Sequence, residues 1–489
     1  MQKRAEQPRP LGSVGDERPV RLRRCGRLVT AGRRVDATLL PEDPGLILGT
    51  LEAPRGAWER DGRRSVHGGT AALVEPDADD GGRFSSVRRR AEAWTGTPGR
   101  DGGGGGSAPP LPRLYGGFSF HAAPDVSGAW SDFPAGRFRV PAHEVRLDGD
   151  GAWLLATRED DGTAAEDARE GLRRLEERIE RALSAGEEGG SGPRPTGTGL
   201  EERVAELTDG GGPAYAGAER ERWIRGVREA LEEVRGGRLE KVVLARTLDV
   251  AADSAASPVR AYRRLRADNP RSSLFFLQPE PGTAFLGASP ELLGAARGSV
   301  FRATAVAGSV PRGESGEEDR ALGRALLESD KDRREQAIVA EEIRRCLVSR
   351  LGAVSVGAPR LLKLARIQHL ESAVEGRLPA GRDLHLLDLL ADLHPTPAVC
   401  GRPRDRALET LRRSEPFERG WYAGPVGWFG PSGQGEFVPG LRSAVLHGGA
   451  WRLFAGAGIV EGSDPVREWE ETGVKFVPML RALDVGSGS

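Results

Sequence analysis

The amino-acid sequence predicts an α+β fold in which large antiparallel sheets form a sandwich flanked by helices. Segments with the apolar–polar alternation of strands outnumber segments with helical periodicity. Strands and helices also follow one another without the strict alternation that builds a doubly wound parallel sheet. No repeat of fixed period is present, which argues against a solenoid or a propeller.

The composition is that of a folded and nearly neutral protein. The chain has 489 residues, of which 38% are hydrophobic, and 71 Lys and Arg against 72 Asp and Glu leave a formal charge of -1. This apolar content can fill a sizeable core. A charge near zero gives no global basic field for nucleic acid, despite Arg-rich patches such as RLRRCGR.

The sequence shows no sign of export or of membrane insertion. It lacks a run of about 18 apolar residues and an apolar segment near the N-terminus. Its three cysteines, Cys25, Cys346 and Cys400, include no C-x-x-C pair, and so few cysteines suit a reducing compartment. We therefore expect a cytoplasmic protein that contacts neither a membrane nor nucleic acid.

Changes in composition divide the chain into three parts. Residues 1–40 are polar and Arg-rich, so we expect a loosely packed leader or an edge strand or two. Residues 41–200 form the N-terminal part of the expected sandwich and contain a Gly-rich loop at 95–113 and a linker at 184–199. Residues 201–485 are denser in strands and helices and form the second part.

In the N-terminal part, residues 114–120 and 137–157 alternate apolar and polar side chains and predict strands, with DGDG at 148–151 as a hairpin turn. Residues 163–185 have the periodicity and the Glu/Arg spacing of an amphipathic helix.

In the second part, a helix at 218–237 precedes a buried strand at 239–250. Residues 317–351 predict one long helix or two consecutive helices. Further strands are predicted at 272–280, 283–289, 300–309, 420–430, 436–449 and 450–460.

The last helix is predicted from its start signals and its periodicity. Ser463 or Asp464 can cap it, and Pro465 suits its first turn. At about 100° per residue, one face is apolar and consists of Val466, Trp469, Phe476, Leu480 and Leu483.

Glu468, Glu471 and Lys475 share the opposite face of this helix. Two carboxylates three residues apart can reach a common cation, and Mg²⁺ prefers a few carboxylates together with waters and a substrate oxygen. The alternative, which is commoner in general, is a solvated face with a Glu471–Lys475 pair.

Asp332 and Glu335 form a second pair of carboxylates three residues apart, in the segment SDKDRREQ. They lie near the start of a helix, where negative charge also complements the helix dipole. Spacing alone leaves both interpretations open, because it does not show whether the two helices meet.

Two more titratable side chains lie next to buried strands. Lys241 begins the apolar strand LEKVVLAR, where loss of water would disfavour the ammonium form and leave an amine able to act as a base. The alternative is a lysine at a strand edge that reaches water. Glu291 in GASPELL could be kept protonated by burial and donate a proton, although Ser289-Pro290-Glu291 is an equally good helix start.

Gly456 and Gly458 lie within the strand FAGAGIV, and glycine there indicates the close approach of a ligand or of another backbone. Arg442 in LRSA offers a planar fork for a carboxylate. Its alternative role is that of a surface arginine on a strand.

Together and in this order, these motifs resemble those of the chorismate-utilising enzymes. The resemblance is dense over about residues 215–485, and a weaker one upstream, in GTLEAPRGAW, YGGFSF and WSDFP, is to the isochorismate-forming branch. The matching segments are LEKVVLAR, GASPELL, TAVAGSVPRG, SDKDRREQ, QHLESAVEG, LHPTPAVCG, FERGWYAGPVGW, GEFVPGLRSA, FAGAGIV and SDPVREWEET with Lys475.

The resemblance implies a single large domain whose Mg²⁺-dependent active site lies between the layers, with residues 201–485 as the chorismate-binding region. Lys241 matches the family's general base, which activates water, and Glu291 matches the general acid, which protonates the departing C4 hydroxyl. Glu335 and Glu471 match the principal Mg²⁺ ligands, with Glu468 and Asp332 helping through water. Residues that match positions around the substrate are Ser309, His369, Tyr422, Arg442, Gly456 and Lys475.

The implied reaction is the conversion of chorismate to isochorismate, which would feed menaquinone or siderophore and salicylate biosynthesis. Relatives that use ammonia usually carry another residue where Lys241 stands, so no glutamine amidotransferase partner is expected, and we expect a monomer. Salicylate synthases share the lysine and go on to eliminate pyruvate, so this activity is the alternative. Gln336 departs from the histidine of many relatives.

A catalytically inactive relative that serves in binding or regulation is a further hypothesis. The presence of all four principal residues, Lys241, Glu291, Glu335 and Glu471, argues against it.

Overall fold

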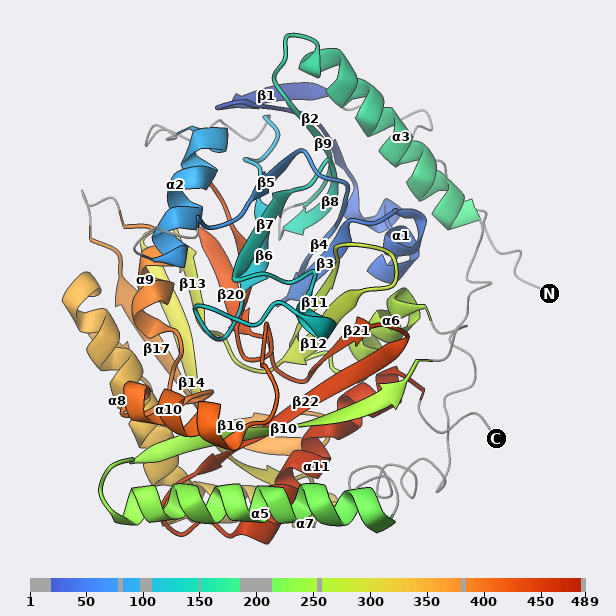
Figure 1. The fold of residues 1–489 in the computed structure, drawn as a ribbon. Helices are drawn as coiled ribbons and strands as arrows, with labels where there is room; N and C mark the ends of the chain where they lie inside the picture. The colour runs from blue at the N-terminus through green and yellow to red at the C-terminus, as the bar shows by residue number, and fades with distance from the viewer. Residues whose placement is uncertain are drawn as a thin grey trace.

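Two antiparallel sheets lie face to face in the computed structural model, which describes residues 19–77, 82–96, 108–148, 151–184, 213–252, 257–379 and 384–484 (Figure 1). An apolar cluster joins them, because Trp58 and Phe275 of one sheet pack in the same core as Trp428 and Val438 of the other. The predicted α+β sandwich is therefore confirmed.

Within the described residues, the first sheet has twelve strands in the order β1-β2-β9-β8-β4-β3-β11-β12-β21-β22-β10-β18. Their bounds, in that order, are Arg21–Cys25, Leu28–Val35, Gly151–Glu159, His143–Asp148, Arg63–Gly68, Arg55–Arg60, Ser273–Gln278, Ala284–Ser289, Ser443–His447, Ala450–Ile459, Lys241–Ala251 and Gly401–Arg402.

The second sheet runs β15-β17-β14-β13-β20-β19-β6-β7-β5, and β16 also pairs with β17. The bounds of these strands are Val354–Val356, Ile367–Arg377, Val300–Pro311, Gly294–Arg297, Gly435–Pro439, Pro425–Phe429, Leu114–Phe118, Gly136–Val140 and Ala72–Val74, with β16 at Arg360–Lys363.

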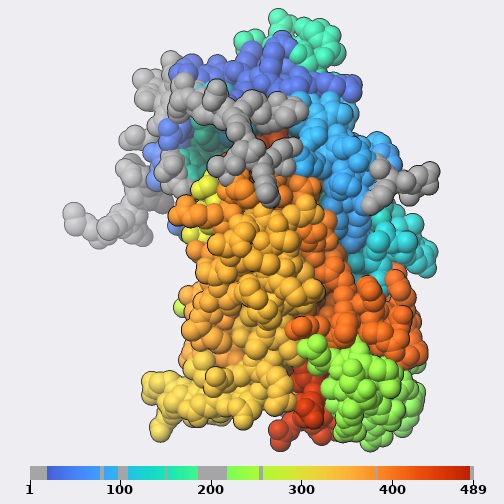
Figure 2. Space-filling view, turned by 90° about the vertical axis from the view of Figure 1, so that its left-hand side faces the viewer, coloured from blue at the N-terminus to red at the C-terminus, as the bar shows by residue number. Residues whose placement is uncertain are grey.

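Helices surround the two sheets (Figure 1). α8 packs against β14 and β17 and forms much of the face seen in Figure 2. The helices are α1 Pro44–Thr50, α2 Arg83–Thr95, α3 Ala164–Ser184, α5 Pro213–Arg235, α6 Pro258–Asp268, α7 Gly316–Glu328, α8 Asp330–Leu351, α9 Leu386–Leu393, α10 Arg404–Ser414 and α11 Pro465–Ala482.

Several local expectations can be compared with these elements. Residues 21–35 form the edge strands β1 and β2 of the first sheet. Residues 317–351 form two helices, because the Ser329 hydroxyl caps a new helix by accepting from the Asp332 N–H. The expected linker at 184–199 lies outside the described residues except for Ser184, which is the last residue of α3, and most of the Gly-rich loop also lies outside them.

Two strand pairs bring distant segments together at the centre of the molecule. β10 pairs with β22 from Val242 to Ala251, so that Ala245 lies opposite Gly456. β14 pairs with β17, and the register shifts between Ala307 and Ser309. Gly308 takes a left-handed φ of 70° there, a conformation that glycine adopts without steric cost.

None of the helices in the described part of the chain combines the length and the apolar character needed to cross a bilayer.

Candidate active site

One cavity lies where these two strand pairs meet α8 and α11. Ten of the twelve predicted site residues line it, and they come from nine different segments of the chain. They are Lys241, Glu291, Ser309, Glu335, His369, Tyr422, Arg442, Gly456, Glu471 and Lys475. The remaining two, Asp332 and Glu468, do not line it.

Lys241 is fully enclosed at the start of β10, with 1% of its surface exposed. Its Nζ lies 2.9 Å from Glu335 Oε1 on α8. A lysine at a strand edge that reaches water is therefore excluded. Gly458 makes room for this pair, since a Cβ at that position would stand 2.1 Å from Glu335 Oε1 and 3.1 Å from Lys241 Cε.

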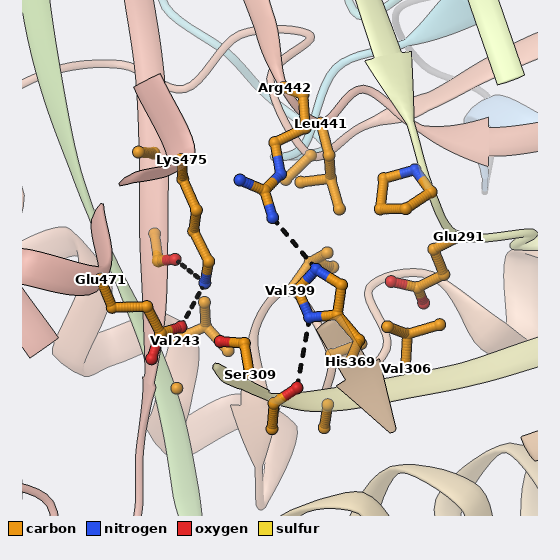
Figure 3. Close-up of a pocket in the computed structure, with 18 of the residues that line it drawn as sticks. Val243, Glu291, Val306, Ser309, His369, Val399, Leu441, Arg442, Glu471 and Lys475 are labelled. Carbon is orange, nitrogen blue, oxygen red and sulfur yellow. Dashed lines mark hydrogen bonds and ion pairs between the residues drawn. The ribbon is translucent and has the colours of Figure 1, made fainter. Parts of the chain in front are cut away.

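A second lysine–carboxylate pair comes from α11. Lys475 Nζ donates to Glu471 Oε1 at 2.6 Å and to the Gly456 carbonyl at 2.7 Å (Figure 3). Burial raises the pKa of Glu471, but Lys475 and the Ser309 hydroxyl outweigh this and hold it below its usual range. The face of α11 that carries Glu471 and Lys475 therefore borders the cavity and is not simply a solvated face.

His369 is neutral and has a defined tautomer. Burial, with Arg442 nearby, lowers the pKa of the ring to about 3. Nδ1 lies 3.2 Å from the Gly308 carbonyl, which can only accept, so Nδ1 carries the proton. Nε2 is then an acceptor for Arg442 Nη2, 3.2 Å away (Figure 3).

Arg442 and Tyr422 also line the cavity. Arg442 is 9% exposed, which excludes the role of a surface arginine, and has a left-handed φ of 48°. Burial lowers its pKa to about 10, so it stays charged at neutral pH. Tyr422 stacks on Phe454 with ring centroids 4.9 Å apart, and burial raises the pKa of its hydroxyl to about 12.

Glu291 stands apart from these ion pairs (Figure 3). It lies in the extended segment between β12 and β13, so the alternative of a helix start is wrong. It is 3% exposed, and its Oε1 has no hydrogen-bond partner among the described residues. Burial raises its pKa to about 8, against the lowering influence of Lys241. The carboxyl is therefore mostly protonated at pH 7.

Asp332 and Glu468 flank the cavity without entering it. Glu468 is 2% exposed and accepts from Lys331 Nζ at 2.8 Å. Asp332 accepts from the Ser329 hydroxyl at 2.5 Å and packs beside Gly308. Burial raises the pKa of both carboxyls. Their part in metal binding stays a prediction.

The donor set suits a hard divalent cation. Glu335 and Glu471 present carboxylate oxygens to one cavity, whereas the described residues include no group of three His, Cys, Asp or Glu side chains placed to hold a metal. Mg²⁺ commonly takes only one or two protein carboxylates and fills its shell with water and substrate oxygens. The residues present therefore fit Mg²⁺ better than an ion that needs a full protein cage.

Sequence reasoning did not find the apolar lining, namely Val243, Val306, Val399 and Phe454. These side chains look like ordinary core residues in the sequence, and only the sheet pairing turns them toward the cavity. Lys331 as the partner of Glu468 was also missed. Its position within SDKDRREQ, next to Asp332, was the available signal.

Residues 46–484 match the protein family described as "Chorismate binding enzyme". The chain belongs to this family. Among curated relatives, the chorismate binding enzyme "Isochorismate synthase MenF" of Bacillus subtilis is 34% identical over 377 residues, which are 76% of this chain and 74% of the relative.

A second relative, "Salicylate biosynthesis isochorismate synthase" of Pseudomonas aeruginosa, is 42% identical over 55% of this chain and 56% of its own length. The match with that relative is therefore closer in sequence but spans little more than half of each protein.

Solved structures of chorismate binding enzymes share the fold. The Escherichia coli menaquinone-specific isochorismate synthase MenF superposes with a TM-score of 0.71 at 24% identity over 96% of both chains. Anthranilate synthase component I from Streptococcus pneumoniae superposes with a TM-score of 0.65 at 20% identity over 85% of this chain and 92% of its own. At these identities the likeness is one of fold.

Proposed function

We propose that this protein is an isochorismate synthase that converts chorismate to isochorismate. The observation that carries the proposal is the presence, in one cavity, of a buried carboxyl that is protonated at neutral pH and a buried lysine. General acid–base chemistry needs such a pair in opposite protonation states. The names of the relatives support the same reaction.

The reaction exchanges one hydroxyl for another. A water adds its oxygen at C2 of the ring, the double bonds shift, and the C4–oxygen bond breaks to release a second water. In the proposed mechanism, Lys241 removes a proton from the incoming water and Glu291 gives its proton to the departing hydroxyl. One water enters and one leaves, so the product is an isomer of the substrate.

The substrate is a dianion, and the cavity offers charges to orient it. In the proposed complex Arg442 and Lys475 would receive its two carboxylates, and Ser309, Tyr422 and Gly456 line the same cavity. His369 accepts from Arg442 and so holds the guanidinium in place. Fixed charges of this kind position the ring for attack without reorganising during the reaction.

Glu335 and Glu471 would hold Mg²⁺, with Glu468 and Asp332 assisting through water. When bound, Mg²⁺ would anchor the ring carboxylate and withdraw charge from it. Lys241 Nζ lies 2.9 Å from Glu335 Oε1, so one carboxylate would both hold the metal and position the proposed base.

We further propose that the protein acts in the cytoplasm as a monomer without an amidotransferase subunit. The product would be a precursor of menaquinone or of salicylate-type compounds, as the names of the relatives suggest for those proteins. Salicylate synthase, in which pyruvate is eliminated from isochorismate, is the alternative outcome of the test below.

The deciding experiment is product analysis by chromatography after incubation of the full chain with chorismate and Mg²⁺. Isochorismate as the only product supports the proposal. Salicylate with pyruvate would replace it with the alternative, and no turnover would contradict both. Activity is expected to disappear when the metal is chelated and to return with Mg²⁺.

Lys241→Ala should reduce turnover by a factor of at least about 100, because it removes the base. The matched control is Lys363→Ala, which removes a lysine that pairs with Asp319 outside the cavity. Equal melting temperatures would show that both variants fold. Isochorismate formation by Lys241→Ala at the wild-type rate would remove the assignment of the base.

A further inference from the structure

A second cavity lies between the two sheets, where β3, β4 and β11 of the first sheet face β6 and β7 of the second (Figure 1). None of the residues that line it lines the first cavity. The side chains that matter here are three arginines, two polar groups and three aromatic rings: Arg55, Arg137, Arg139, His67, Asp132, Tyr115, Phe133 and Trp421.

Three arginines line this second cavity, and the carboxylates near Arg139, which are Glu280, Glu75 and Asp132, form no ion pair with it among the residues that the structure describes. Arg55 donates hydrogen bonds to the Gln278 side chain and to the backbone carbonyls of Leu48 and Leu51. Arg137 pairs with Glu75 at 2.5 Å. Arg139 has a buried Nε without a hydrogen-bond partner in the described part of the chain. Burial lowers the pKa of Arg139, with Arg137 adding to the effect and Glu280, Glu75 and Asp132 opposing it. A cation without a close ion pair is costly in such a place.

His67 gives a second, independent indication from the opposite sheet. It is 7% exposed, lines the same cavity, and its Nε2 has no partner among the described residues. Burial lowers its pKa to about 4, so the imidazole is neutral at pH 7. A buried ring nitrogen left without a partner is uncommon, because each unmade hydrogen bond destabilises the fold.

Aromatic rings form the apolar part of the lining. Tyr115 stacks on His67 with centroids 4.3 Å apart, and its hydroxyl donates to Glu144, away from the ring face. Trp421 donates its Nε1 proton to the Pro134 carbonyl and packs edge-to-face on Phe133. With their polar atoms satisfied elsewhere, these rings offer surfaces on which a flat apolar group can pack.

We propose that this second cavity binds a small aromatic carboxylate, with the carboxylate on Arg139 and His67 and the ring against Phe133 and Trp421. Such a ligand would give Arg139 an ion pair and His67 a hydrogen-bond partner at the same time. The site is independent of the proposed synthase activity. Because Trp421 directly precedes Tyr422 of the first cavity, an occupant would touch the chain one residue from the active site.

The test is isothermal titration calorimetry of the full chain with benzoate as the probe and benzamide as its uncharged counterpart. Wild type is expected to bind benzoate and not benzamide. Arg139→Leu should weaken benzoate binding by about tenfold or more, the effect of losing a hydrogen bond to a charged group. His67→Phe, which keeps the stacked ring and comes from the other sheet, should also weaken it.

Two control variants make the result specific. Arg302→Leu removes an arginine from β14 whose ion pair with Glu375 is exposed, and should leave benzoate binding unchanged. Arg442→Leu removes the arginine of the first cavity and should also leave benzoate binding unchanged. The proposal is overturned if wild type takes up no benzoate at millimolar concentration, or if only Arg442→Leu loses binding.

Discussion

Glu291 is kept neutral by its surroundings and not by a hydrogen bond. It is enclosed in the cavity, its Oε1 lacks a partner among the described residues, and burial raises its pKa to about 8. The ordinary value for a glutamate is 4.5. Between these two pH values the folded protein holds a proton that the unfolded chain releases. The free energy of unfolding must therefore fall as the pH rises through this range.

Glu291→Gln separates function from stability at this residue. The amide cannot donate a proton to the leaving hydroxyl, so kcat should fall by a factor of about 100 or more. The amide also never ionises, so the variant should melt above wild type by a margin that is small near pH 5 and grows toward pH 8. Melting temperatures measured across this range check the sign.

Glu461→Gln is the matched control, because Glu461 has an exposed side chain and only a 3.5 Å contact with Arg334. It should change neither activity nor the pH dependence of melting. A constant difference between Glu291→Gln and wild type at every pH would show that Glu291 is ionised in the folded protein.

Gly458→Ala tests how closely the Lys241–Glu335 pair is packed. The new methyl group would collide with Glu335 Oε1, the movable end of a side chain, and leave the backbone of β22 in place. Activity is expected to fall at least tenfold with little change in melting temperature. Gly49→Ala in α1 is the control, since nothing lies within 4 Å of its added Cβ. Full activity of Gly458→Ala would show that Glu335 can move without loss.

The helix α11 carries three of the charged residues around the site on one element. Its N-terminus is fixed by Asp464, whose Oδ1 accepts from the Val466 and Arg467 N–H groups at 3.0 and 2.9 Å. Glu468 and Glu471 follow within the next two turns. The cap therefore stabilises the helix end that presents these carboxylates.

Asp464→Ala should lower the free energy of unfolding by about 1 kcal/mol, and Asp464→Asn should restore most of it, because asparagine caps helices equally well. Chemical denaturation of the three proteins measures both effects. If alanine and asparagine are equally destabilising, the charge of Asp464 matters and its capping bonds do not.

Individual elements were well predicted from the sequence, but their exposed and buried faces only in part. The apolar face of α11 is buried at Trp469, Phe476 and Leu480, as periodicity predicts, whereas Val466 is 36% exposed and the prediction for it was wrong. Glu468 on the opposite face is buried, because Lys331 of α8 packs against it and donates a hydrogen bond to its carboxylate. Periodicity identifies the apolar side of a helix, but a helix packed on two sides buries polar residues as well.

At the scale of the whole molecule, the sheet order is what a single sequence could not provide. β10 pairs with β22, about 200 residues later in the chain, and the cavity exists only because of this and the β14–β17 pairing. Local patterns contain no information on such partners. The resemblance to chorismate-utilising enzymes supplied the convergence of Lys241 and Glu471 that spacing alone left open.

The strands β1 and β2 form one edge of the first sheet, and we expect them to keep the molecule from aggregating. β1 and β2 cover β9, and Leu28, Val29 and Ala31 are fully buried there. Deleting residues 1–35 would expose the unpaired backbone of β9, which favours association between molecules. Light scattering should show aggregation and calorimetry a lower melting temperature, while the monomeric fraction keeps its kcat. A truncated chain that stays monomeric with an unchanged melting temperature would contradict this role.

The pairing of Lys241 with Glu335 and of Lys475 with Glu471 means that the resting cavity carries its own counter-ions. A ligand that binds one of these carboxylates separates it from its lysine, and a ligand that binds one of these lysines separates it from its carboxylate. Binding of an ion in this cavity is therefore an exchange of ionic partners and adds no uncompensated charge. To redesign the cavity for an uncharged ligand, both members of an ion pair would have to be replaced together, because replacing one would leave the other buried without a partner.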